Sequence, residues 1–296
     1  MVREQSRMCE ANACGTAALI DIVCVSRMDI KTYLHRVGIE ATTAPSLESL
    51  RELHRQHLLS VPFESLSMHS GEKIILDQAL TYEKIVIKRR GGFSYENNGL
   101  FLWVLQVLGY KPRVLSARVK DIITGVYGPL YDHMILTVEL EGRRWLCDVG
   151  FGDGIREPFR LEAGWEEEQD ACVFRLREDQ GEWFLEKKEA NSWRSLYKFT
   201  LEERQYQEFK EMCEYHQTTP SSFFVRKSFC SLQLPRGRLT YIGHQLTSTK
   251  FTPDGEVKTT QVLTDEEIPN VLRDNFGVVL SGKLVAKEEI LPPTCE

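Results

Sequence analysis

Hydrophobic residues recur every three or four positions in residues 28–109, which is the spacing of amphipathic helices. Asp29 is placed to cap the first predicted helix, and Gly38 is placed where that helix should stop. Four apolar residues fall on one face of this helix: Ile30, Tyr33, Leu34 and Val37. The segment from 29 to 38 therefore predicts one short, capped helix.

A second helix is predicted over 46–60, where leucines recur near helical spacing until "VPFESL" interrupts the pattern. A short third segment, "TYEKIVIKRR", precedes two glycines. After Ser94 the apolar residues again keep helical spacing as far as Gly109, a residue type favoured at helix C-termini. Residues 28–109 are thus predicted to form a helical bundle.

The hydrophobic pattern changes to a period of two after residue 110, which is typical of β-strands. The predicted strands lie within four segments: 113–119, 133–152, 172–179 and 182–190. We expect an antiparallel sheet or barrel here, with the acidic segment "WEEEQD" at 165–170 as a solvated loop.

The last third, from residue 219 onward, mixes strand and helix patterns. Its predicted strands are separated by the turn sequences "PRG" and "PDG". Thr264 and Glu267 have the spacing of a capping box, which predicts a helix directly after them.

Composition indicates a globular chain whose ligands are small molecules. The chain has 296 residues, of which 42% are hydrophobic and 27% charged, enough for a large buried core. The net charge of −6 and the lack of a basic stripe argue against nucleic acid or an anionic membrane as a partner. We expect a monomer.

The cysteines have no CxxC pair and no repeated spacing, which suits a reducing cytosol better than a disulfide framework. Their spacing also predicts no zinc site and no other metal. The eight are Cys9, Cys14, Cys24, Cys147, Cys172, Cys213, Cys230 and Cys295. Residues 1–27 predict a flexible extension, because their apolar run is too short for a membrane helix and lacks the basic start of a signal peptide.

The hairpin "DHMILTVELEGRRWLCDVG" allows a geometric prediction. If residues 141–142 form a two-residue turn, opposed positions sum to 283, so Ile135 faces Asp148 and His133 faces Gly150. His133 and Asp148 then share one face of the sheet as diagonal neighbours about 7 Å apart, so that carboxylate and imidazole can meet. A three-residue turn would place them on opposite faces. A half-buried structural histidine beside a strand-end aspartate is the alternative interpretation.

Ser94 follows Gly91 and Gly92 at a predicted helix start, where backbone N–H groups are free to bind an anion. This is a suitable place for a nucleophile beside an oxyanion. The alternative is that Ser94 is only an N-cap residue, since serine is favoured there.

Three segments resemble the arylamine N-acetyltransferase family: "RGGFSYENN", "DHMILTV" and "WLCDVGFG". The separations of 39 residues from Ser94 to His133 and of 15 from His133 to Asp148 also match that family. The similarity extends from about Met28 to the C-terminus and includes "TPSSFF" and "KSFCSLQ".

The resemblance implies an α+β fold in three parts after the extension at 1–27. These are a helical bundle (28–109) with the nucleophile position, a β-barrel (110–218) with the histidine and aspartate, and an α/β lid (219–296). It also implies acetyl transfer from acetyl-coenzyme A, a co-substrate, to arylamines, arylhydrazines or N-hydroxyarylamines by a ping-pong mechanism.

The family uses a cysteine-protease-like Cys–His–Asp triad, and the matching positions are Ser94, His133 and Asp148. Carried over by position, Phe93 and Phe151 line the acceptor side, and Tyr215 and Ser221 lie near coenzyme A. Gly152 is a further substrate or coenzyme A contact. Two departures stand out: the segment before "YKFTLEE" is shorter than in mammalian members, and serine replaces cysteine.

Serine in place of cysteine at position 94 predicts slow acetyl transfer. A cysteine, with an ordinary pKa of about 8.5, needs only a modest influence to ionise, whereas a serine must lose its proton to His133 during the attack. An acetyl-serine ester is also a poorer donor to an aromatic amine than a thioester. Two other functions stay open: a non-catalytic protein that binds coenzyme A or arylamines, and a serine-type acetyl-coenzyme A hydrolase.

Overall fold

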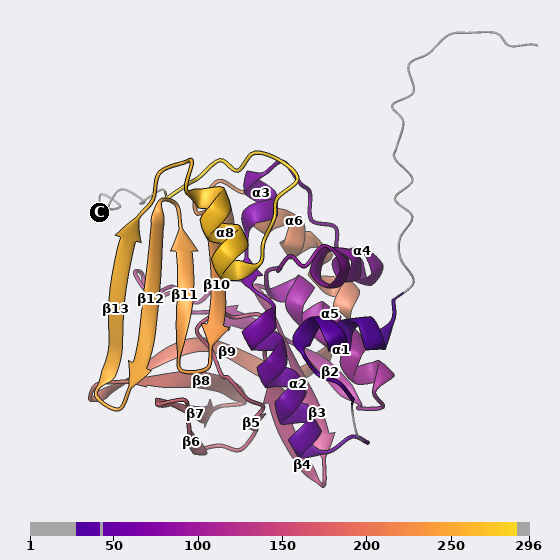
Figure 1. Cartoon of the computed structure of the whole chain (residues 1–296). Coiled ribbons are helices and arrows are strands. Elements are labelled where there is room, and N and C mark those ends of the chain that lie inside the picture. Colours follow the sequence, from indigo (N-terminus) through magenta and orange to yellow (C-terminus); the bar gives the residue numbers. More distant parts are fainter. Residues whose placement is uncertain (1–27, 42–43, 289–296) are drawn as a thin grey trace, which may run out of the picture.

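The computed structural model describes residues 28–41 and 44–288, so the predicted extension at 1–27 lies outside the described residues. Helices gather beside two antiparallel sheets (Figure 1). The helical elements, including the π-helical η1 and the 3-10 helix η2, are α1 (Ile30–Val37), α2 (Leu47–Ser60), α3 (Leu66–His69), α4 (Gln78–Tyr82), η1 (Glu83–Ile87), α5 (Ser94–Val107), η2 (Tyr206–Phe209), α6 (Lys210–Thr218), α7 (Phe223–Arg226) and α8 (Ile268–Phe276).

One sheet has eight strands in the order β5-β4-β3-β2-β9-β8-β7-β6 and forms a nearly closed barrel; the other has the order β1-β10-β11-β12-β13. The eight-stranded sheet consists of β2 (Pro112–Val119), β3 (His133–Leu140), β4 (Arg143–Cys147), β5 (Phe159–Arg160), β6 (Glu166–Gln169), β7 (Cys172–Asp179), β8 (Glu182–Glu189) and β9 (Ser192–Arg204). The five-stranded sheet consists of β1 (Phe63–Glu64), β10 (Phe229–Leu234), β11 (Gly237–Ile242), β12 (Gln245–Thr252) and β13 (Gly255–Val262).

The first helix confirms the sequence prediction at both ends. The Asp29 carboxylate accepts the Thr32 N–H at 3.0 Å, which satisfies one of the free amides of the first turn. Gly38 ends the helix in the left-handed conformation, with φ of 79°. The second predicted helix is α2, which begins after Ser46, a residue that caps the Ser49 N–H.

The hairpin of β3 and β4 also confirms its prediction. Leu136 pairs with Cys147 and Leu140 with Arg143, so opposed positions sum to 283 as expected. Residues 141–142 both have positive φ, 51° and 73°, as a two-residue turn between twisted strands requires. The face shared by His133 and Asp148 therefore follows from the turn length.

One sequence prediction differs from the structure. The acidic segment 165–170, expected as a loop, contains the strand β6, which pairs with β7. As an edge strand, β6 has a partner on one side only, and its acidic side chains reach solvent while Gln169 is buried. The helix expected after Thr264 and Glu267 is α8, which begins at Ile268, and the Glu267 carboxylate accepts the Thr264 N–H at 2.8 Å.

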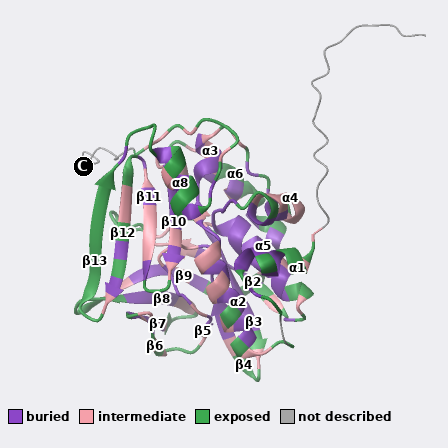
Figure 2. Cartoon of the chain, in the orientation of Figure 1, coloured by how far each residue is buried: buried purple, intermediate pink, exposed green. Residues whose placement is uncertain are grey.

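Helix α5 packs on β2 and β3 of the barrel, whereas α2 and α8 lie against β10 of the five-stranded sheet. Buried residues concentrate where helices and sheets meet (Figure 2). The largest core combines side chains from α1, α2 and α5 with those of β3 and β4. A second core fills the barrel, and a third lies between α8 and the five-stranded sheet. Because α5 lies against β3, the N-terminus of α5 and the start of β3 are brought close together. Among the described residues, none of the helices is both long and apolar enough to cross a membrane.

Candidate active site

Ser94 is the first residue of α5, and Phe93 occupies the N-cap position. Within the described residues the Ser94 hydroxyl makes no hydrogen bond, so the interpretation of Ser94 as a helix cap is wrong. The N–H groups of Ser94 and Tyr95, the first two residues of α5, have no helical partner one turn back, whereas the Glu96 N–H donates to the Phe93 carbonyl at 3.1 Å. The side chain of Ser94 is thus placed beside free N–H groups, as the sequence predicted.

The two glycines before Ser94 are required by close packing. A Cβ atom on Gly91 would lie 2.1 Å from the Pro62 carbonyl oxygen, and one on Gly92 would lie 2.5 Å from Cβ of Glu96. The Gly92 N–H donates to Pro62 at 3.2 Å, and the Gly92 carbonyl accepts the Glu64 N–H at 3.0 Å. The backbone that leads into α5 is therefore fixed against β1.

Arg90 fixes the same segment from inside the protein. Its guanidinium is buried and lies 2.9 Å from the Glu64 carboxylate, which also accepts the Leu66 N–H at 2.7 Å. A further ion pair joins Arg90 to Glu72 at 3.0 Å. Buried charges need this degree of pairing, since an unpaired charge in the interior is costly.

His133 and Asp148 form the contact that the hairpin geometry predicted. Nε2 of His133 lies 2.8 Å from Oδ2 of Asp148, and both residues are buried. The other ring nitrogen, Nδ1, has no hydrogen-bond partner among the described residues. This orientation leaves Nδ1 available for a proton from a nucleophile, while the carboxylate holds the ring.

The surroundings of Asp148 lower the pKa of its carboxyl group. Burial by itself raises that pKa, but the interaction with His133 and hydrogen bonds from Asn98 and from the Gly150 N–H lower it below its ordinary value. The carboxylate is therefore ionised at neutral pH and can orient an imidazole and stabilise its charged form.

Asn98 joins α5 to the pair and was not predicted from the sequence. Its amide donates to Asp148 Oδ1 at 2.9 Å and to the Met134 carbonyl at 2.6 Å, and its oxygen accepts the Val149 N–H at 2.9 Å. The available signal was its spacing, four residues after Ser94, which places both on one helix face.

Gly150 brings Ser94 beside the pair. A Cβ atom there would lie 2.8 Å from Cα of Ser94 and 2.8 Å from Nδ2 of Asn98, so only glycine fits. The Gly150 N–H donates to the Asp148 carboxylate at 3.0 Å. The structure thus gathers the three predicted triad positions around one glycine.

Aromatic rings surround the imidazole. The rings of Phe151 and Tyr197 lie 5.4 Å and 5.3 Å from that of His133. Phe93, predicted on the acceptor side, is fully buried and lies 5.5 Å from the ring of Phe224 on α7. Gly152 has a φ of 83°, and its carbonyl accepts a hydrogen bond from Gln233.

Tyr215 and Ser221, predicted near coenzyme A, both lie in the segment of α6 and α7. Tyr215 is 41% exposed, and Ser221 is exposed with its carbonyl accepting from Arg226 at 3.2 Å. Neither residue has a recorded contact with Ser94 or His133 among the described residues. The ring of Tyr215 lies 5.6 Å from that of His216, which lies 5.0 Å from Phe224, the neighbour of Phe93.

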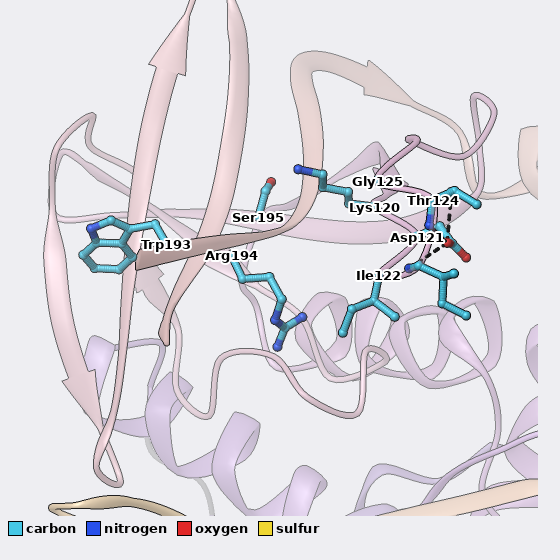
Figure 3. Close-up of a pocket in the computed structure, with 9 residues that line it drawn as sticks. Lys120, Asp121, Ile122, Thr124, Gly125, Trp193, Arg194 and Ser195 are labelled. Carbon is cyan, nitrogen blue, oxygen red and sulfur yellow. Dashed lines mark hydrogen bonds between the residues drawn. The ribbon is translucent and has the colours of Figure 1, made fainter. Parts of the chain in front are cut away.

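A surface pocket of about 380 Å³ lies between the loop after β2 and the start of β9 (Figure 3). It contains none of the predicted site residues, and Asp121 there organises its own loop by accepting the Thr124 N–H at 2.7 Å. Arg194 connects the pocket to the site, because it pairs with Asp153, two residues after Phe151, at 3.0 Å. In the described part of the chain, no group of three or more His, Cys, Asp or Glu residues could hold a metal.

The sequence profile of a family described as N-acetyltransferase matches residues 46–285. The chain is 37% identical over 280 residues to the pineal gland isozyme NAT-3 of arylamine N-acetyltransferase from Gallus gallus, covering 87% of this chain and 97% of that one. It is 33% identical over 282 residues to arylamine N-acetyltransferase 1 from Homo sapiens, with 88% and 97% covered.

Solved structures of arylamine N-acetyltransferases also resemble this chain. The arylamine N-acetyltransferase of Nocardia farcinica superimposes with a TM-score of 0.78 at 32% identity, over 86% of this chain and 90% of that one. The Mycobacterium marinum enzyme in complex with CoA superimposes with a TM-score of 0.75 at 29% identity, over 84% and 92%.

Proposed function

Because the chain belongs to the arylamine N-acetyltransferase family, we propose that it transfers an acetyl group from acetyl-coenzyme A to arylamines, arylhydrazines or N-hydroxyarylamines. The observation that carries this proposal is the buried pair of His133 and Asp148. Two residues after Asp148, Gly150 packs directly against Ser94. The proposal includes the three-part layout and the cysteine-protease-like order of the triad.

The proposed reaction has two steps at one oxygen. In the first, Oγ of Ser94 attacks the thioester carbonyl while Nδ1 of His133 takes its proton; the carbon–sulfur bond breaks, and coenzyme A leaves with that proton. In the second, the amine attacks the acetyl-serine, the carbon–oxygen bond breaks, and Ser94 regains a proton from the amine through His133. Asp148 holds the imidazole in both steps.

Substrate contacts are proposed at the positions carried over from the family. Phe93 and Phe151 serve the acceptor side, Tyr215 and Ser221 serve coenzyme A, and Gly152 contacts one of the two ligands. Support comes from Phe151, whose ring is half-buried directly against the imidazole of His133. The M. marinum relative with bound CoA supports coenzyme A as a ligand of this fold.

Serine at position 94 makes the proposed transfer slow. The hydroxyl does not ionise ahead of the attack, and its oxygen is smaller than the sulfur that the family uses. A nucleophile misplaced in this way lowers the rate of acetyl transfer by about a hundredfold. None of the described cysteines is suited to replace it: burial raises the pKa of each thiol, as for Cys213, whose pKa is about 12.

The test is the intact mass of the protein after incubation with acetyl-coenzyme A, with and without an arylamine. The proposal predicts a gain of one acetyl group on Ser94 that an arylamine removes slowly. Continued release of coenzyme A without an amine would instead indicate a hydrolase. Coenzyme A binding with no change of mass would indicate a binding protein and would contradict the proposal.

A further inference from the structure

Two histidines of α2, His54 and His57, are completely buried, three residues apart on the inner side of the helix. They have different partners. His57 contacts the Tyr33 hydroxyl at 2.9 Å through Nδ1, and no other hydrogen bond is recorded for its ring among the described residues. His54 instead contacts the backbone of the segment that carries Asp148.

The hydrogen bonds of His54 determine its tautomer. The Asp148 N–H can only donate, so Nε2 of His54, 3.1 Å away, must be the acceptor. The ring proton is therefore on Nδ1, which lies 3.2 Å from the Arg156 carbonyl oxygen and donates to it. One neutral imidazole thus satisfies one backbone donor and one backbone acceptor eight residues apart.

Asp148 and Arg156, the two residues whose backbone His54 contacts, lie at the ends of a segment that packs against the candidate site. Gly150, which packs on Ser94, and Phe151, which packs on His133, both lie between Asp148 and Arg156. We propose that His54 is a positioning residue that fixes Asp148 and the segment 149–156, and thereby the hydrogen bond between Asp148 and His133. This inference rests on the role proposed for Asp148.

The burial of His54 supports a permanently neutral ring. Burial lowers the pKa of His54 to about 4, and the hydrogen bond to Arg156 and the charge of Asp148 oppose that shift only in part. At neutral pH the ring therefore adds no positive charge beside the Asp148 carboxylate. A lysine or arginine could not accept the Asp148 N–H, and a leucine could satisfy neither backbone group.

His57 provides a matched control for a test. Both histidines are on α2, both have 0% exposure, and burial lowers the pKa of both. His54→Leu and His57→Leu therefore remove equally buried rings, but only the first removes contacts with the candidate site. His54→Gln is the conservative variant, because its amide oxygen can still accept the Asp148 N–H.

The first measurement is the ring N–H proton resonance of His133 in full-length protein labelled with ¹⁵N-histidine. The hydrogen bond to Asp148 moves this resonance downfield. We expect it to be lost or shifted upfield in His54→Leu, retained in His57→Leu, and partly restored in His54→Gln. This readout does not depend on acetyl transfer, so it stands even if the proposed function fails.

The second measurement is the rate of arylamine acetylation, with Ser94→Cys present in every variant. His54→Leu should lower kcat about 10- to 100-fold with KM nearly unchanged, since small misplacement of a catalytic group has an effect of this size. His57→Leu should stay within about twofold of its parent, the scatter expected for a residue outside the site.

The inference is overturned if folded His54→Leu keeps the downfield resonance and the kcat of His57→Leu. If His54→Leu does not fold, His54→Phe, which fills the site with a ring but has no hydrogen-bonding atom, decides in its place: an unchanged resonance position together with an unchanged kcat would overturn the inference.

Discussion

The Asp148 carboxylate receives hydrogen bonds from a ring nitrogen, a side-chain amide and a backbone N–H, each from a different residue. Two of these partners, His133 and Gly150, come from the hairpin and its continuation, and the third, Asn98, comes from α5. The carboxylate is thus fixed by two separate elements before any substrate binds, as pre-organised electrostatics requires.

Asp148→Asn removes the charge and keeps the shape. In a chain that also carries Ser94→Cys, we expect the kcat for acetyl transfer to fall by about 10²- to 10⁴-fold, because the imidazole loses its orienting and charge-stabilising partner. The measurement is steady-state arylamine acetylation at neutral pH. A fall of less than about threefold in a folded variant would mean that Asp148 does not act through His133.

At this scale the sequence could predict the pairing of His133 with Asp148 but not the residues around it. The pair lies in one hairpin, so the parity of the turn decides which side chains share a face. Asn98 and His54 reach Asp148 from 50 and 94 residues away in the chain. Such contacts depend on how α2 and α5 pack on the barrel, and no local pattern encodes that packing.

The turn before α5 depends on a buried ion pair. Arg90 and Glu64 are both almost fully buried, so neither charge has water as an alternative partner. Arg90→Leu leaves Glu64 charged and unpaired, and the free energy of unfolding should fall by about 3–5 kcal/mol, measured by urea denaturation.

An exposed ion pair is the control for this change. Lys73 and Glu214 lie 3.0 Å apart with largely exposed side chains, so Lys73→Leu should cost less than about 1 kcal/mol. Adding Glu64→Gln to Arg90→Leu should recover part of the loss. Equal effects of Arg90→Leu and Lys73→Leu would contradict the importance assigned to the buried pair.

The histidines of α2 predict a pH dependence of stability. Burial lowers the pKa of His54 to about 4 and that of His57 to about 3, against about 6.5 in an unfolded chain. Between these values the unfolded state binds protons that the folded state excludes. The free energy of unfolding should therefore fall as pH drops below about 6.5, by about 1.4 kcal/mol per pH unit for each histidine.

Urea unfolding at about pH 7 and about pH 5 measures this effect. The stability difference between the two pH values should be smaller in His57→Leu than in the native sequence, by roughly 2 kcal/mol. An identical difference in the two proteins would show that His57 does not stay neutral in the folded state.

Helix ends and turns were predicted correctly where a few neighbouring residues determine the structure. The cap at Asp29 and the short turn at 141–142 both encode their structure within a few residues. The strand β6 was mistaken for a loop because its acidic residues suggest solvation, whereas pairing with β7 decides its conformation. The long strand β9 was not predicted; only its pairing with β2 and β8 distinguishes it from its polar surroundings.

At the scale of the whole molecule, the sheets link distant parts of the chain. Phe63 and Glu64, within the predicted helical bundle, pair with β10, within the predicted lid. The backbone of Gly92 is bonded to the same short strand, so the approach to Ser94 is connected to the C-terminal sheet. The proposed domain boundaries near 109 and 218 stay a prediction.

The central claim is that Ser94 occupies the position of a nucleophile in an acetyltransferase site. The most direct test is Ser94→Cys, assayed for transfer of acetyl from acetyl-coenzyme A to an arylamine, with Ser231→Cys, a buried serine of β10, as the control. The account predicts a rate at least about a hundredfold above that of the native sequence for Ser94→Cys, and no gain for Ser231→Cys. A folded Ser94→Cys protein that binds coenzyme A and transfers no acetyl group would contradict it.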